Sequence, residues 1–208
     1  DLNPAGGWLA TANGTGGTAL WPLDSNRPLV FEGHSEMVWG LTFTPSGDWL
    51  LSSAFDGTVR RWPLRFEVAP SGDILSEQNS EMFTAVATDP RGRWVATADS
   101  LGFGVKKEWK ARLWDLEAED QSTAGTVLRA HEDTTVGRVL ISPDSRWLVT
   151  VGTDEIPLML WDLQDRNPPL SGVSLCPEPV PGELLAFDAT FVDGGRSLQT
   201  IGGDGLRT

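Results

Sequence analysis

"LLSSAFDGTVRRWPL", residues 50–64, contains two runs of β-forming residues that flank the tight-turn pair Asp56-Gly57. This pattern predicts a β-hairpin with its turn at that pair. A two-stranded hairpin buries too little apolar surface to offset the backbone entropy that it loses on folding. The hairpin must therefore pack against further strands, and the rest of the chain indicates which ones.

The strand-like run at residues 49–53 is repeated along the chain. The five copies are "WLATA" at 8–12, "WLLSS" at 49–53, "WVATA" at 94–98, "WLVTV" at 147–151 and "SLQTI" at 197–201. A turn rich in Gly, Asp and Ser precedes each copy, and four copies are followed by a short run that contains a tryptophan: Trp21, Trp62, Trp114 and Trp161. Such self-similarity at about 40 to 50 residues is typical of a repeat array. We place the repeats approximately at 1–32, 33–80, 81–131, 132–183 and 184–208.

Each repeat contains up to four short runs of β-forming residues separated by Pro, Gly and Asp turns, and none carries a sustained helical period. Four short antiparallel strands at this spacing predict an all-β fold, a β-propeller of four-stranded antiparallel blades. The first copy lacks most of its innermost strand, and the last stops where a tryptophan should follow. The chain then covers about four and a half blades, and we expect a parent propeller of about seven.

The stretch "GHSEMVWGLTFTPSGDWLLSSAFDGTVRRWPL", residues 33–64, resembles the WD-repeat family, whose units run from a Gly-His pair to a Trp-Asp pair. The resemblance extends over essentially the whole chain, and the style of the repeats is similar to that of bacterial WD-repeat proteins. It implies one polar chain per blade that links a tryptophan, a hydroxyl, a histidine and a turn aspartate. The residues at these positions are His34, Ser52, Asp56 and Trp62 in the second repeat and His131, Thr150, Asp154 and Trp161 in the fourth.

Such a polar chain is chemically reasonable, because an indole N–H only donates, a carboxylate only accepts, and hydroxyl and neutral imidazole groups do both. A buried network stabilises a fold only when every member is satisfied. Some repeats depart from the pattern: the third has Asn79 near the histidine position, the first has Thr15 in place of the aspartate, and Trp21 and Trp62 are followed by proline. We expect these blades to depend more on packing.

Composition narrows the functions further. The net charge of −13 would repel a phosphate backbone, so we expect no nucleic-acid partner. No apolar stretch is long enough to cross a membrane and no leader is evident, which predicts a cytoplasmic chain without a membrane partner. The single cysteine, Cys176, excludes an internal disulfide framework and a cysteine-based zinc site. We expect no cofactor and no metal.

Catalysis is also not expected. The only histidines, His34 and His131, both occupy the Gly-His position. Ser52, His34 and Asp56 form a possible nucleophilic triad, but the blade network accounts for the same three residues. The glycine-rich "NGTGGT" at 13–18 lacks the Gly-Lys-Ser/Thr ending of a phosphate loop and is read as a turn. The sequence therefore predicts no catalytic residue and no enzyme.

One segment is a candidate for partner binding. The third repeat carries about ten extra residues, "SLGFGVKKEWK" at 100–110, which include all three lysines of the chain. Basic and aromatic residues commonly anchor binding sites, and the candidates here are Phe103, Lys106, Lys107, Trp109 and Lys110. The alternative is a solvated hairpin extension whose Trp109 covers its own blade, and both readings stay open. Trp39, on the predicted innermost strand, is read as a core residue because that strand alternates apolar positions.

Together these features predict a non-catalytic protein–protein interaction scaffold. The resemblance implies that loops between the second and third strands lie on the top face, which WD-repeat propellers commonly present to partners. The alternative is a propeller segment of a larger enzyme or signalling protein, with a kinase, caspase-like or NTPase domain outside this chain. A hydrolase site in the central channel is disfavoured, because histidines and metal-ligand clusters are missing there.

Overall fold

The computed structural model describes residues 1–65, 72–77, 82–100, 109–117, 125–128, 136–152, 158–164, 172–175, 188–202 and 205–207. Within these residues the fold is all β, with no α-helix and a single short 3₁₀ turn, η2 (Asp193–Gly195). The strands form five antiparallel sheets that we number in chain order. The predicted all-β class is therefore confirmed.

Each sheet is built from strands that are consecutive in the sequence. Sheet 1 holds β1 (Trp8–Ala12), β2 (Thr18–Pro22) and β3 (Leu29–Phe31). Sheet 2 holds β4 (Val38–Phe43), β5 (Trp49–Ala54), β6 (Thr58–Pro63) and β7 (Asp73–Glu77). Sheet 3 holds β8 (Met82–Thr88), β9 (Trp94–Ser100), β10 (Trp109–Asp115) and β11 (Gly125–Leu128). Sheet 4 holds β12 (Val136–Ile141), β13 (Trp147–Gly152), β14 (Leu158–Asp162) and β15 (Val173–Ser174). Sheet 5 holds β16 (Asp188–Val192), β17 (Ser197–Gly202) and β18 (Gly205–Arg207).

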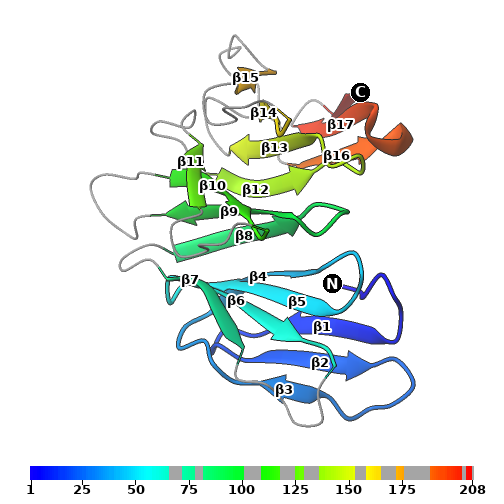
Figure 1. Ribbon diagram of the computed structural model, residues 1–208, viewed down its shortest axis with the longest axis vertical. Coiled ribbons are helices and arrows are strands. Elements are labelled where there is room, and N and C mark those ends of the chain that lie inside the picture. Colours follow the sequence, from blue (N-terminus) through cyan, green and yellow to red (C-terminus); the bar gives the residue numbers. More distant parts are fainter. Residues whose placement is uncertain are drawn as a thin grey trace.

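The sheets follow one another in space as they do in the sequence (Figure 1). The first strands of sheets 2 to 5, which we call the inner strands, lie beside one another: β4 contacts β8, β8 contacts β12, and β12 contacts β16. In sheets 2 and 3 the inner strand begins, and the second strand ends, at one edge that we call the top edge. The opposite edge, with the turns at 44–48 and 89–93, is called the bottom edge. These are the stacked four-stranded sheets of a propeller.

The hairpin predicted at residues 50–64 is present. Strands β5 and β6 pair antiparallel from Trp49 with Pro63 to Ser53 with Val59. Gly57 has a φ of 76°, a left-handed conformation that residues with a Cβ rarely adopt. The carboxylate of Asp56 accepts the backbone N–H of Thr58 at 2.9 Å, which closes the turn.

Neighbouring sheets bury apolar faces against each other, and the tryptophans of the third strands are central to this packing. Trp62 and Trp161 are completely buried and Trp114 is 7% exposed. Trp62 stacks on Phe31 of sheet 1, with ring centroids 5.2 Å apart and planes within 8°. Face-to-face burial of this kind is what a lone hairpin lacks, and it explains why the repeats are stable only as neighbours.

Three glycines lie directly under these tryptophans. A Cβ added at Gly72, Gly125 or Gly172 would come within 2.5–2.6 Å of the ring of the tryptophan in the same sheet. Only a residue without a side chain fits such a position, so each glycine lets the fourth strand approach the indole closely. The sequence interpretation did not recognise these positions, although each glycine follows its tryptophan at the start of the fourth strand.

Candidate functional site

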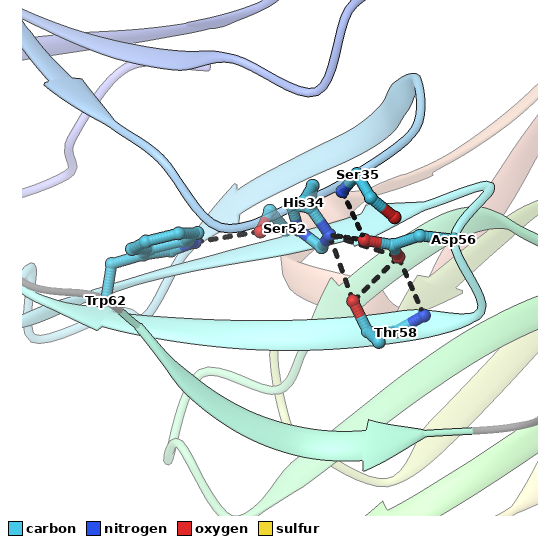
Figure 2. A network of polar contacts seen from close by, with 6 residues as sticks. All are labelled: His34, Ser35, Ser52, Asp56, Thr58 and Trp62. Atoms are coloured by element: carbon cyan, nitrogen blue, oxygen red, sulfur yellow. Dashed lines mark hydrogen bonds and ion pairs between the residues drawn. The ribbon is translucent and has the colours of Figure 1, made fainter.

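The polar network of sheet 2 begins with an indole–hydroxyl hydrogen bond. Trp62 on β6 donates its Nε1–H to the Oγ of Ser52 on β5, at 2.8 Å (Figure 2). Both residues are completely buried. A buried indole N–H without an acceptor would be costly, so the hydroxyl satisfies a group that the packing of the tryptophan places away from water.

His34 extends this bond to the turn between β5 and β6. Its side chain is completely buried, with Nε2 2.7 Å from Ser52 Oγ and Nδ1 2.9 Å from Asp56 Oδ2. A carboxylate only accepts, so Nδ1–H donates to Asp56, and in a neutral ring Nε2 then accepts from the hydroxyl of Ser52. The hydroxyl in turn accepts from Trp62. One directional chain therefore satisfies all four side chains.

The Asp56 carboxylate is the most strongly bonded member. It also accepts hydrogen bonds from the backbone N–H of Ser35 at 3.0 Å and from the Thr58 hydroxyl at 2.7 Å. Burial raises the pKa of Asp56, but the hydrogen bonds from His34, Thr58 and Ser35 outweigh it and hold that pKa well below its ordinary value. The carboxylate is therefore ionised at neutral pH and ties the segment 34–35 to the turn 56–58 at the top edge.

The distances within Ser52, His34 and Asp56 are those of a nucleophilic triad, but the surroundings are not. Ser52 has no exposed surface, and its oxygen already accepts the indole N–H of Trp62. A nucleophile must reach a substrate carbonyl. The arrangement in sheet 2 can fix a loop, and it offers no route for a substrate to the hydroxyl.

The indole–hydroxyl bond recurs in sheets 1, 3 and 4. The donor–acceptor distances are 2.9 Å for Trp21–Thr11, 3.0 Å for Trp114–Thr97 and 3.2 Å for Trp161–Thr150. His131 and Asp154, the remaining members proposed for the fourth repeat, lie outside the described residues, as does Asn79. Their role in a second complete network stays a prediction.

The five residues proposed for partner binding are only partly within the described chain. Phe103, Lys106 and Lys107 lie outside it. Trp109 is the first residue of β10, and Lys110 pairs in register with Asp99 of β9. Because β9 ends and β10 begins at the top edge, the insertion leaves sheet 3 at that edge. Its role in binding is not decided by this geometry.

The interpretation of Trp39 as a core residue is wrong. Its side chain is 58% exposed, and its ring stacks on Phe55 with centroids 5.5 Å apart and planes within 13°. The register of β4 on β5 shifts between Val38 and Gly40, so Trp39 is an extra residue in a β-bulge. A strict period of two assigns it to a buried face, and the bulge removes it from that alternation.

Two kinds of feature are absent from the described ranges. No helix there is long and apolar enough to span a membrane. No group of three or more His, Cys, Asp or Glu side chains there has the geometry to hold a metal ion.

Stacked four-stranded sheets, one of which (sheet 2) contains a complete Trp–Ser–His–Asp chain, have the arrangement of WD-type propeller blades. The family model described as "WD domain, G-beta repeat" matches residues 26–63 and 122–156. These two segments of the chain are therefore similar to repeats of the WD-repeat family.

Three known proteins are similar to segments of this chain, and each is much longer than the segment that matches. Coronin-7 from Homo sapiens is 27% identical over 176 residues, which are 82% of this chain and 18% of coronin-7. Striatin from Rattus norvegicus is 30% identical over 113 residues, 50% of this chain and 14% of striatin. Ribosome biogenesis protein bop1 from Danio rerio is 44% identical over 71 residues, 34% of this chain and 9% of that protein. The chain thus spans less than a fifth of each.

Proposed function

We propose that this chain is a non-catalytic scaffold for protein–protein interaction and that it presents the loops of its top edge to a protein partner. The observation that carries the proposal is the exposed Trp39, whose side chain is 58% exposed and stacks on the half-buried Phe55. An exposed tryptophan ring forgoes the favourable free energy of burial, and aromatic side chains are frequent anchors in interfaces.

The pair is also held rigidly. Phe55 immediately precedes Asp56, whose carboxylate is fixed by His34 and Thr58, and the backbone N–H of Phe55 donates to the carbonyl of Met37 at 2.9 Å. A preorganised surface loses less conformational entropy on binding than a flexible one. The buried network therefore serves binding indirectly, by keeping the turn below the aromatic pair in one conformation.

The insertion at 100–110 is proposed as the second part of the same surface. In the sequence it contributes Lys106, Lys107, Lys110, Phe103 and Trp109 to a chain of net charge −13, and the strands that flank it, β9 and β10, end and begin at the top edge. A local cluster of lysines favours a partner with an acidic surface at this point. We propose a protein as the partner rather than a nucleic acid or a membrane, and the cytoplasm as the compartment.

The test uses affinity capture with the intact protein and two variants. In one variant, Trp39→Ala with Phe55→Ala removes the aromatic pair; in the other, residues 101–110 are deleted. A control, Val30→Ala with Val173→Ala, truncates exposed apolar side chains of outer strands, which are 52% and 59% exposed. We expect a partner that both the wild type and the control capture and that the aromatic variant loses. Capture unchanged in both test variants would discard the proposal.

A second candidate is a propeller segment of a larger enzyme or signalling protein. The observation that favours it is that the similar proteins are several times longer than the matched segment. Under this proposal the repeats position a kinase, caspase-like or NTPase domain located elsewhere. Sequencing the complete gene decides between the two, since such a domain would show its own phosphate-loop, kinase or Cys-His signature.

A further inference from the structure

A groove lies between sheets 2 and 3 at the bottom edge, away from the Trp39–Phe55 pair. Its volume is about 590 Å³. Its walls are the turn segments 44–46 and 90–92, together with Trp49 and Arg61 of sheet 2 and Leu116 of sheet 3. The groove thus combines an indole, an aliphatic side chain and the two prolines of the turns with two arginines, Arg61 and Arg91.

Within the described chain, no strong ion pair neutralises the positive charge of either arginine. The Cζ of Arg61 lies 4.3 Å from the centroid of the Trp49 ring, which holds the guanidinium in place. Its ion pair with Asp73 is long, at 3.3 Å, and the side chain of Asp73 is 67% exposed, so this pair is weak. Within the described chain, Arg61 Nε is buried without a hydrogen-bond acceptor, and the exposed Arg91 guanidinium has no ion pair.

The repeats that follow show what sheet 2 lacks. Arg93 and Arg146 also lie over tryptophans, at 4.7 and 4.6 Å from the ring centroids. Each of these arginines pairs with the aspartate that follows the tryptophan of the third strand, Asp115 at 2.7 Å and Asp162 at 3.1 Å. In sheet 2 the position of Arg93 is occupied by Asp48 and that of Asp115 by Pro63, which has no carboxylate. The guanidinium over Trp49 comes instead from Arg61 on β6, and no aspartate follows Trp62 to pair with it.

Two aspartates near the groove do not neutralise its arginines, because both are bonded to other groups. Asp48 pairs with Arg65 at 2.8 Å, and the buried Asp89 accepts the backbone N–H groups of Arg91 and Trp94. Neither aspartate lines the groove. Among the described residues that line the groove, the ionisable ones are the two arginines, in a chain whose net charge is −13. Charge complementarity thus points to an anionic occupant, and the apolar lining points to a peptide rather than a simple ion.

We propose that this groove binds an extended acidic peptide segment of a partner protein. An Asp or Glu side chain of the segment pairs with Arg61 and Arg91, and a neighbouring Pro or Leu side chain packs between Trp49 and the turn prolines. The site is separate from the top edge and does not rest on the function proposed above. A chain with both surfaces can hold two partners at once.

The probe is a displayed library of random 12-residue peptides, selected on the intact protein. Selected peptides are then synthesised with a fluorescent label, and their affinity is measured by polarisation. We expect selection of Asp or Glu next to Pro or Leu. Replacing these acids by Asn or Gln in the peptide should weaken binding about tenfold, the loss expected for one charge-assisted contact.

Variants of the protein locate the site. Arg61→Gln with Arg91→Gln should weaken binding about tenfold or more, and Arg91→Gln alone serves if the double variant does not fold, because Arg91 is exposed. The matched control, Arg27→Gln with Arg196→Gln, removes two exposed arginines elsewhere and should change the affinity less than twofold.

Hydrogen exchange gives the second readout. Bound peptide should slow amide exchange at 44–49 and 90–92. The proposal is overturned if no acidic peptide is selected, if Arg91→Gln binds like the wild type, or if protection falls on 37–39 and 55–56 at the top edge instead.

Discussion

The sharpest test of the buried network is Ser52→Ala. The substitution removes Ser52 Oγ, which lies 2.8 Å from the indole Nε1 of Trp62 and 2.7 Å from Nε2 of His34. Both of these buried groups then lack this hydrogen-bond partner. Each unsatisfied buried group costs about 1 to 3 kcal/mol. The free energy of unfolding should therefore fall by about 2 to 6 kcal/mol, a large part of the about 5 to 15 kcal/mol available to a domain.

The neighbouring serine is a matched control. Ser53 lies on the same strand and is equally buried, but within the described residues its Oγ makes no hydrogen bond. Ser53→Ala removes the same atom and leaves no partner behind, so we expect a change below about 0.5 kcal/mol. Urea unfolding followed by circular dichroism measures both variants, provided that the transition is two-state.

A double-mutant cycle identifies the bond itself. In a Trp62→Phe background the indole N–H is absent, so Ser52→Ala should cost only the histidine contribution, about half of its value in the wild type. Equal destabilisation by Ser52→Ala and Ser53→Ala, or an unchanged cost of Ser52→Ala in the Phe background, would refute the reasoning.

Three further predictions follow from the same geometry. Folding lowers the pKa of Asp56, so its ionised form stabilises the protein fully above the ordinary pKa of 3.8 and progressively less as the pH falls below that value. The difference in the free energy of unfolding between the wild type and Asp56→Asn should therefore shrink between pH 5 and pH 2. A difference that stays constant over this range would contradict the assignment. Gly125→Ala places a Cβ 2.5 Å from the Trp114 ring and should lower the free energy of unfolding by about 1 to 3 kcal/mol, whereas Gly14→Ala, with no atom closer than 3.7 Å, should be nearly neutral in thermal unfolding. Arg93→Gln breaks a solvent-exposed ion pair and should cost less than about 1 kcal/mol in urea unfolding at low salt, with the loss vanishing in 1 M NaCl.

The strands and their grouping into sheets could be predicted because the repeat offers each signal several times. The hairpin at Asp56-Gly57 combines turn residues with alternating apolar runs, and a run similar to its first strand recurs once in each repeat. The contact of Trp62 with Ser52 was implied by the resemblance to the WD-repeat family, and the hydroxyl lies at the same position in all five copies. Local chemistry that recurs is readable from one sequence.

Features that depend on three-dimensional proximity were not predicted. The bulge that exposes Trp39 leaves no mark in the alternation of β4, because one extra residue looks like part of the strand. The groove between sheets 2 and 3 joins residues from turns far apart in the chain, Trp49 and Arg91 among them. The charge of its two arginines, Arg61 and Arg91, becomes evident only from the contacts that surround them in the folded chain.

The bulge is not confined to β4. The inner strands β8 and β12 shift register in the same place, which leaves Thr84 and Gly137 as the extra residues. A residue outside the pairing pattern can be exchanged without disturbing the interior, as Trp, Thr and Gly at equivalent points illustrate. The second, third and fourth repeats therefore each carry one position at which new recognition can evolve while the architecture stays as it is.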